Sequence, residues 1–224
     1  MVKDACLSQK SFRTVYKPAG VPVFPLHDGT GTDSILERIY AEEPSRKEIE
    51  WPSGFEGGIV HRLDRSTSGA VLVANDLTTL QNIREVFQAR QFVKTYRFIA
   101  SKHVPWDVHY CDRMIAHQKG RKGRMVVQRG ANTPHRGKWY AARTDFRRID
   151  GPLFEAVIST GVMHQIRVHS AFLGIPILGD RIYGGGATPE SAPDGVVFFL
   201  HHLGMTNGDV IGTSDIPLPA WAGP

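Results

Sequence analysis

The chain has 224 residues, of which 41% are hydrophobic and 22% charged, a balance typical of a folded globular protein and not of a disordered chain. Cys6 and Cys111 are its only cysteines, which excludes a disulfide framework and favours a reducing, cytoplasmic location. No apolar run approaches the roughly 20 residues that span a bilayer, and the formal net charge of +5 favours polyanionic partners.

The first predicted elements are a strand and a short helix. Residues 15–23 are predicted to form a strand interrupted by a turn, because the Pro and Gly within residues 17–20 favour a chain reversal. Residues 32–41 are predicted to form a helix with Thr32 or Asp33 as its N-cap, since apolar residues recur along one side of it.

A loop, a buried strand and a second helix are expected next. Prolines and glycines are frequent in residues 42–58, which favours a loop. Residues 69–74 form a continuous apolar run, typical of a strand covered on both faces. Residues 76–90 have the clearest helical pattern, and Thr78 with Gln81 fits a capping box.

The remaining elements follow without a regular alternation of strands and helices. Residues 92–100 alternate in polarity as a strand does, and residues 153–159 and 196–201 are further strand candidates. Residues 163–173 are predicted to form a helix that ends at Gly174. We therefore predict an α+β fold with a mixed, mostly antiparallel sheet flanked by helices.

Positive charge is concentrated in the second half of the chain. Between Arg113 and Arg148 there are eleven Lys or Arg residues and one acidic residue, Asp145. A groove that follows a phosphate backbone needs such a density of cations, although a solvated loop has the same composition. Within this stretch, residues 119–138 are predicted to be a basic insertion with the form of a loop or hairpin.

The segment HRLDRSTSG (residues 61–69) places a single carboxylate, Asp64, directly before the predicted buried strand. Catalytic groups are common in such loops because a rigid strand holds them. Arg62 and Arg65 flank Asp64, and nearby cations favour an ionised carboxylate. The alternative is an Asx-turn, in which the Asp64 side chain bonds nearby backbone N–H groups.

Two further segments carry polar groups in a suggestive pattern. In TGVMHQIRVH (residues 160–169), His164 and Arg167 are three apart and share a helix face, although an amphipathic helix with a solvated Arg is the alternative. His164 and His169 are five apart, which does not fit the i, i+4 zinc pair of a metalloprotease. In Lys94-Thr95-Tyr96, the strand tyrosine is either a core residue or a group that faces the cleft of Asp64.

These segments together resemble the RluA-type family of RNA pseudouridine synthases. HRLDRSTSG is similar to the family signature, which is HRLD, two residues and then TSG. The other matches lie in the family's order: KPAG (17–20), KTY (94–96), HQIRVH (164–169), LGIPI (173–177) with Gly179, Asp180 and Tyr183, and Leu200-His201. The resemblance covers roughly residues 11–219. Val162 and Met163 depart from it, because the family usually has Arg followed by Thr or Ser there.

The resemblance implies a pseudouridine synthase catalytic fold with a central cleft. One catalytic domain is expected over residues 1–224, with no RNA-binding domain of the S4 type. The implied reaction isomerises specific uridines of structured RNA, ribosomal or transfer RNA, by breaking the N1–C1′ bond and forming a C5–C1′ bond. It needs no redox change and gains no atom, so we expect no cofactor and no metal. A monomer is the default expectation.

The resemblance also implies roles for individual residues. Asp64 matches the essential carboxylate, Arg167 a basic residue that pairs with it, and Tyr96 a tyrosine that stacks on uracil or transfers a proton. Arg62 is expected to fill the space of a flipped-out uridine or to hold the flipped backbone, and Lys17 to contact phosphate or brace the loop. The residues expected to bind RNA are Arg62, Arg65, Lys17, His164, Gln165, Lys119, Arg121, Lys122 and Arg124.

Three other functions remain open from the sequence. A catalytically silent RNA-binding module would give no pseudouridine. A glycoside or nucleoside hydrolase using Asp64 would release free uracil, and normally needs a second carboxylate as general acid. A metal-dependent nuclease would need a cluster of Asp, Glu and His at ligand spacing, which the sequence does not offer.

Overall fold

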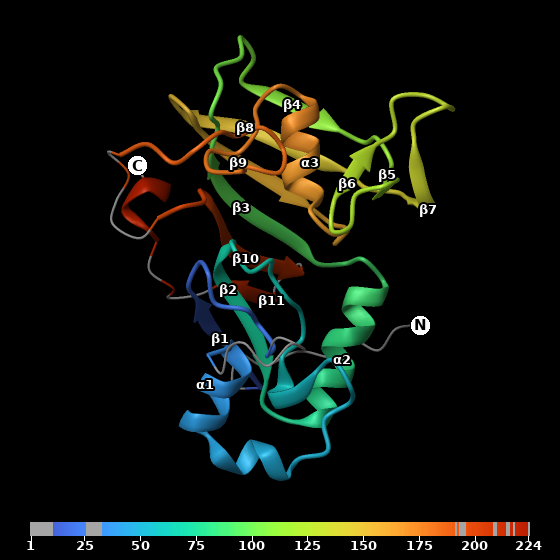
Figure 1. Cartoon of the computed structure of the whole chain (residues 1–224). Coiled ribbons are helices and arrows are strands. Elements are labelled where there is room, and N and C mark those ends of the chain that lie inside the picture. Colours follow the sequence, from blue (N-terminus) through green and yellow to red (C-terminus); the bar gives the residue numbers. More distant parts are fainter. Residues whose placement is uncertain are drawn as a thin grey trace. The chain divides into compact units, whose positions relative to one another are not determined.

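The computed structural model describes residues 11–25, 33–190, 192, 196–207, 210–213, 216 and 218–223 (Figure 1). The chain groups into two compact units. Unit 1 comprises Met1–Lys94 and His202–Pro217, and unit 2 comprises Thr95–His201 and Leu218–Pro224. That the whole chain acts as one catalytic domain stays a prediction.

The strands of unit 1 are built around β2 (Ser68–Ala74). Strand β1 (Phe12–Lys17) pairs antiparallel with β2, with Phe12 opposite Ala74 and Lys17 opposite Gly69. Strand β10 (Leu200–Asn207) lies beside β2, and β11 (Val210–Thr213) pairs antiparallel with β10. All seven residues of β2 are buried, which confirms the prediction from its continuous apolar run.

The described part of unit 1 also contains two α-helices and two short 3₁₀ helices. Helix α1 spans Ile35–Glu42 and α2 spans Leu77–Gln88, and the 3₁₀ helices Pro44–Glu48 and Glu56–Gly58 lie within the predicted loop. Side chains of α2, β1 and β2 share one apolar core. Its buried members are Phe12, Val60, Leu72, Ala74, Leu80, Ile83, Phe92 and Met205.

Both helix caps of unit 1 differ from those predicted. The N-cap of α1 is Ser34, whose hydroxyl accepts the Glu37 N–H at 3.2 Å, so the choice of Thr32 or Asp33 is wrong. Thr32 lies outside the described residues. The N-cap of α2 is Asp76, which accepts the Thr79 N–H at 2.7 Å, so the capping box at Thr78 is wrong. In both cases the cap is the last extended residue before the apolar stripe, where a side-chain oxygen reaches the N3 amide.

The larger sheet of unit 2 has the order β3-β9-β8-β4. Its strands are β3 (Val93–Ile99), which begins in unit 1, β4 (Val108–Cys111), β8 (Thr144–Asp150) and β9 (Leu153–Ile158). Strand β8 pairs antiparallel with β9 on one side and with β4 on the other. The rings of Phe98 and Phe154 stack at 5.6 Å in its core.

A second sheet of unit 2 contains the basic insertion. Strand β5 (Ile115–Gln118) lies between β6 (Met125–Val127) and β7 (His135–Tyr140), and both neighbours are antiparallel to it. Residues 119–138, predicted to be a basic loop or hairpin, form the β5–β6 turn, β6, the segment after it and the first part of β7. Helix α3 (Gln165–Phe172) packs beside β6 and β8 (Figure 1). A core of Ile115, Met125, Val127, Ala142, Val168 and Tyr183 joins them.

Helix α3 begins and ends close to its predicted bounds. It starts at Gln165 and not at residue 163, because His164 takes a left-handed conformation with φ 56°. Its end is confirmed by Gly174 at φ 86°, a conformation that favours glycine. Strand β10 begins at Leu200, so the prediction of a strand from residue 196 is wrong for its first four residues.

The α+β prediction is confirmed by the mixture of antiparallel strands and α-helices in the described residues. A last 3₁₀ helix (Ala220–Ala222) completes unit 2, where Trp221 packs on Phe199 and Arg97 of β3 donates to the Ala222 carbonyl at 2.6 Å. Within the part of the chain that the structure describes, no helix has the length and apolarity to cross a membrane.

Candidate active site

The loop of Asp64 is a tight turn between a buried segment and β2. The Thr67 N–H donates to the Asp64 carbonyl at 3.0 Å, and the Leu63 side chain is buried beside it. The Asp64 residue itself is half-buried. The loop therefore holds its carboxylate-bearing residue at the surface on a fixed backbone.

Lys17 braces this loop from inside. Its side chain is fully buried, and its ammonium group donates to the carbonyls of Pro18 at 2.9 Å, Val21 at 2.7 Å and Arg65 at 3.0 Å. Burial lowers the pKa of Lys17 to about 8, while the nearby Asp64 carboxylate acts to raise it. All three N–H groups of this buried ammonium meet internal acceptors, which agrees with the bracing role, the second of the two roles expected for Lys17. A contact between Lys17 and RNA stays a prediction.

His61 fixes the other end of the loop to β2. Its Nε2 accepts the Leu72 N–H at 3.0 Å, and its ring meets that of His202 edge-on at 5.5 Å. Burial lowers the pKa of His61 well below its usual value, so the imidazole is neutral at neutral pH. At Gly69, with φ 125°, an added Cβ would lie 2.2 Å from the His202 carbonyl oxygen, which explains the glycine of this motif.

The two arginines that flank Asp64 differ in their surroundings. The Nε of Arg65 donates to the Gly20 carbonyl at 2.7 Å, and the Gly20 N–H returns a bond to the Arg65 carbonyl at 2.8 Å. Arg65 thus ties the turn after β1 to the Asp64 loop. Arg62 is exposed, as a residue that contacts RNA must be.

In unit 2, Arg167 is held by a buried carboxylate. Its Nε and Nη2 donate to the two oxygens of Asp180 at 2.8 and 3.0 Å, and both side chains are almost fully buried. Its guanidinium also lies 5.2 Å from the centre of the Tyr183 ring. Tyr96, the other predicted catalytic residue of this unit, is buried on β3 with 7% of its surface exposed.

His164 and Gln165, both predicted to bind RNA, make internal contacts. The Nδ1 of His164 lies 2.9 Å from the Tyr183 hydroxyl. The Gln165 amide donates to the Arg143 carbonyl at 2.9 Å, and its oxygen accepts from the Thr160 hydroxyl at 2.8 Å and the Val162 N–H at 3.2 Å. Gln165 is 3% exposed and its amide groups all have internal partners, so its role in RNA binding stays a prediction. It anchors the start of α3.

His169, which the spacing argument excluded from a zinc pair, completes this anchor. Its Nδ1 lies 2.9 Å from the Thr144 hydroxyl and its Nε2 lies 2.9 Å from the Arg113 carbonyl. The carbonyl can only accept, so Nε2 carries the proton and the neutral ring satisfies both contacts. Burial lowers the pKa of His169 to about 4, which keeps this neutral form at neutral pH.

The predicted RNA contacts of the insertion gather at the β5–β6 turn. Lys119, Arg121 and Lys122 are exposed there, and Arg124 is half-buried, with its guanidinium 5.5 Å from the centre of the Tyr183 ring. The turn therefore presents a cluster of cations, and its last member packs on the same tyrosine as Arg167.

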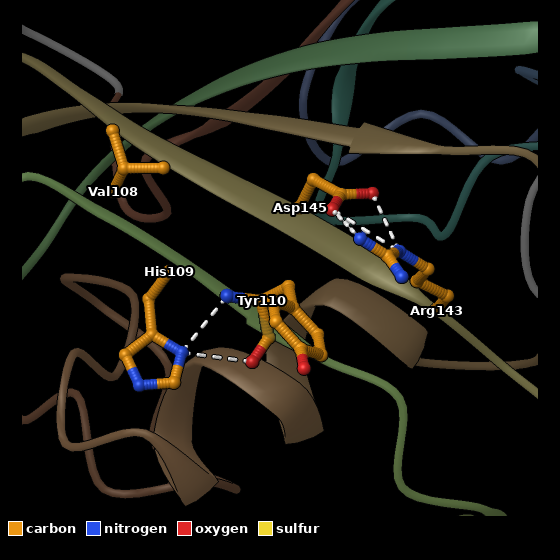
Figure 2. Close-up of a pocket in the computed structure, with 5 residues that line it drawn as sticks. All are labelled: Val108, His109, Tyr110, Arg143 and Asp145. Carbon is orange, nitrogen blue, oxygen red and sulfur yellow. Dashed lines mark hydrogen bonds and ion pairs between the residues drawn. The ribbon is translucent and has the colours of Figure 1, made fainter.

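A hollow on the surface of unit 2 is lined by residues of β4 and by residues at and just before the start of β8 (Figure 2). Arg143 makes an ion pair with Asp145 at 2.7 Å, and its guanidinium lies 4.5 Å from the Tyr110 ring centre. The lining residues Val108, His109, Tyr110, Arg143 and Asp145 include none of the predicted site residues.

Two residues around Arg167 received no role from the sequence. Asp180 and Tyr183 were identified only as matches to the family's motifs, and that match was the signal in the sequence that could have singled them out. The structure makes them the direct partners of Arg167. By contrast, Asp64 lies in unit 1 and Arg167 in unit 2, so their pairing stays a prediction.

Comparison with known proteins agrees with the sequence motifs. The family model described as RNA pseudouridylate synthase matches residues 11–172, which include both the Asp64 loop and α3. The chain belongs to this family. Among the residues that the structure describes, no group of three or more His, Cys, Asp or Glu side chains could hold a metal ion.

Family relatives are identical to this chain at about a third of the aligned positions. An uncharacterized RNA pseudouridine synthase of Aquifex aeolicus is 33% identical over 174 residues, covering 76% of this chain and 52% of the relative. Ribosomal large subunit pseudouridine synthase D of Neisseria meningitidis is 30% identical over 193 residues, covering 84% and 48%. The chain thus spans about half the length of these relatives.

Solved structures show the same fold. Human RNA Pseudouridylate Synthase Domain Containing 1 superposes with a TM-score of 0.71 at 22% identity, covering 96% of this chain and 84% of that one. The corresponding human Domain Containing 4 protein gives a TM-score of 0.66 at 24% identity. At these identities the likeness supports the pseudouridine synthase fold and nothing finer.

Proposed function

We propose that this protein isomerises uridine to pseudouridine in RNA and that Asp64 is its essential carboxylate. Family membership supports the reaction. The observation that carries the residue assignment is the Asp64 loop itself, which Lys17 braces from below and His61 ties to β2. Such internal bracing is what a loop needs in order to present a reacting group in a fixed geometry.

The reaction breaks the N1–C1′ bond, turns the base and forms a C5–C1′ bond, so every atom of the uridine is retained. Asp64 adds to C1′, attacks C6, or assists formation of a glycal intermediate. A covalent carboxylate would divide one difficult step into two easier ones. An enzyme that catalyses this reaction is an isomerase and requires no redox cofactor.

Arg167 and Tyr96 are proposed to complete the site. Asp180 already fixes the Arg167 guanidinium through two hydrogen bonds, and a guanidinium held in this way can orient a second carboxylate, that of Asp64. The Tyr96 ring would stack on the uracil. Because a uridine inside a stem cannot be reached, it must leave the stack, and Arg62, which is exposed, is proposed to fill its space or hold the opened strand.

Ribosomal RNA is the first substrate to test, because the name of one relative specifies the large ribosomal subunit. Transfer RNA is the second. The cations of the β5–β6 turn, Lys119, Arg121, Lys122 and Arg124, are proposed to follow the phosphate backbone, together with Arg65 and His164. We also propose a cytoplasmic monomer as the working form.

The decisive experiment is to replace Asp64 by Asn (Asp64→Asn). The variant should form no pseudouridine on unmodified ribosomal or transfer RNA transcripts, as measured by acylation of the product and mass spectrometry. Its RNA affinity should stay within about tenfold, since phosphate contacts dominate binding while the carboxylate acts in the transition state. The matched control is Asp150→Asn, which alters an exposed carboxylate on β8.

Wild-type turnover by Asp64→Asn would contradict the assignment of Asp64. Release of free uracil by the wild-type protein would instead indicate a hydrolase. RNA binding without any product from the wild-type protein would indicate a silent binding module.

A further inference from the structure

We propose that Asp180 and Tyr183 are positioning residues for Arg167, and that Tyr183 links the orientation of Arg167 to the placement of the basic β5–β6 hairpin. This proposal rests on the proposed function, because it gives Arg167 a role in the isomerisation. Its structural part concerns unit 2 alone and can be tested without any reaction.

Asp180 is a rigid anchor. Its residue is 1% exposed, and its two carboxylate oxygens accept from Nε and Nη2 of Arg167 at 2.8 and 3.0 Å. Oδ1 also accepts the backbone N–H groups of Ile182 at 3.1 Å and Tyr183 at 3.2 Å. A carboxylate that caps its own turn cannot rotate, so the planar guanidinium bound to it is confined to one orientation.

Tyr183 contacts Arg167 and the hairpin with one side chain. The guanidinium groups of Arg167 and Arg124 lie 5.2 and 5.5 Å from the centre of its ring. Its hydroxyl accepts the Met125 N–H, at the start of β6, at 2.8 Å. The same hydroxyl lies 2.9 Å from His164 Nδ1, at the N-cap of α3.

The protonation of Tyr183 suits this double contact. Burial raises the pKa of the phenol to about 12, so the hydroxyl keeps its proton at neutral pH. It can therefore accept from Met125 and donate to His164 at the same time. A phosphate backbone that moves the hairpin cations would act on the Met125 contact, and through the Tyr183 ring on the guanidinium.

Two variants separate the parts of this arrangement. Tyr183→Phe keeps the ring beneath both guanidinium groups and removes the hydroxyl that holds Met125 and His164. Asp180→Asn keeps the shape of the anchor and removes its charge. The matched control is Tyr110→Phe, which removes an exposed hydroxyl on β4.

Measured against the wild-type protein on unmodified ribosomal RNA transcripts, Tyr183→Phe should lower kcat about tenfold and change KM less than about twofold, since the loss of one or two buried hydrogen bonds is of this size. Asp180→Asn should lower kcat further, and Tyr110→Phe should match the wild type. A purely structural role would lower thermal stability without this split between kcat and KM.

A spectroscopic measurement tests the same proposal on the protein alone. In ¹⁵N-labelled protein, the Arg167 Nε–H signal should shift in Asp180→Asn, and the Met125 amide should exchange faster in Tyr183→Phe. Adding an RNA stem-loop should move the Arg167 signal in the wild type and not in Tyr183→Phe.

Wild-type kcat in Tyr183→Phe, or an Arg167 signal that responds to RNA equally in both proteins, would overturn the proposal. If the wild-type protein makes no pseudouridine, the proposed function fails, whereas the spectra still decide whether Asp180 and Tyr183 position Arg167. Because Tyr183→Phe keeps the packed ring, it carries the test even if Asp180→Asn, which leaves the buried Arg167 charge uncompensated, does not fold.

Discussion

At the residue scale, the position of Asp64 depends on a lysine that never reaches the solvent. The Lys17 ammonium satisfies carbonyls on both sides of the turn after β1 and the Arg65 carbonyl next to Asp64. Removing such a donor leaves buried acceptors without partners, which costs more than the hydrogen bonds themselves contribute. Lys17 therefore links the turn after β1 to the Asp64 loop.

Replacing Lys17→Met should lower the free energy of unfolding by on the order of 3 kcal/mol, because three carbonyls lose a charged donor. Urea denaturation measures this, with exposed Lys102→Met as the control, for which no loss is expected. The salt dependence of RNA binding should be unchanged. A shallower salt slope in Lys17→Met would show that the lysine contacts phosphate after all.

At the element scale, the β5–β6 hairpin combines a buried stem with a cationic tip. Met125 and Val127 belong to the core under α3, while Lys119, Arg121 and Lys122 are exposed at the turn. The stem fixes where the cations lie. A hairpin built in this way contributes affinity through charge, with little contribution from apolar contact.

Changing the four hairpin cations to Gln should weaken RNA binding and flatten the dependence of log Kd on log salt by about 3, since each phosphate contact contributes roughly 0.7 to 0.9 to that slope. Fluorescence anisotropy at several salt concentrations measures the slope. The control changes an equal number of exposed cations outside the hairpin, namely Lys47, Arg90, Lys102 and Arg181. An unchanged slope in the hairpin variant would place this element off the RNA path.

At the scale of the whole molecule, neutral buried histidines make the fold sensitive to acid. His169 and His201 are almost fully buried, and burial lowers the pKa of each to about 4. Below a pH of about 6.5 the unfolded chain binds protons at these positions that the folded chain does not. Stability is therefore lost as the pH falls from about 6.5 towards 4.

The free energy of unfolding should fall by up to about 2 kcal/mol per buried histidine between about pH 7.5 and about pH 5. Urea denaturation at the two pH values measures the difference. His169→Gln should reduce it, and the exposed His103→Gln should not. A pH dependence that His169→Gln leaves unaltered would show that the His169 ring is not a source of the acid sensitivity.

The sequence by itself determined the features that depend on residues adjacent in the chain. The apolar run of β2, the helical stripe of α2, the end of α3 at Gly174 and the HRLD and HQIR segments were all visible in the chain. Local pattern decides these features because side-chain periodicity and backbone preference act over a few residues. Strands β4 and β8 lacked such a pattern, and neither was predicted.

Only the tertiary structure decided which polar side chains face inward. Lys17 and Gln165 were predicted to bind RNA because they lie in motifs that resemble those of the family. In the structure, both side chains donate hydrogen bonds to backbone carbonyls in the interior. Asp180 and Tyr183 gained their role because a turn brings them to Arg167 from more than ten residues away. Burial and hydrogen-bond partners are set by contacts between distant segments, and the order of residues along one segment does not encode them.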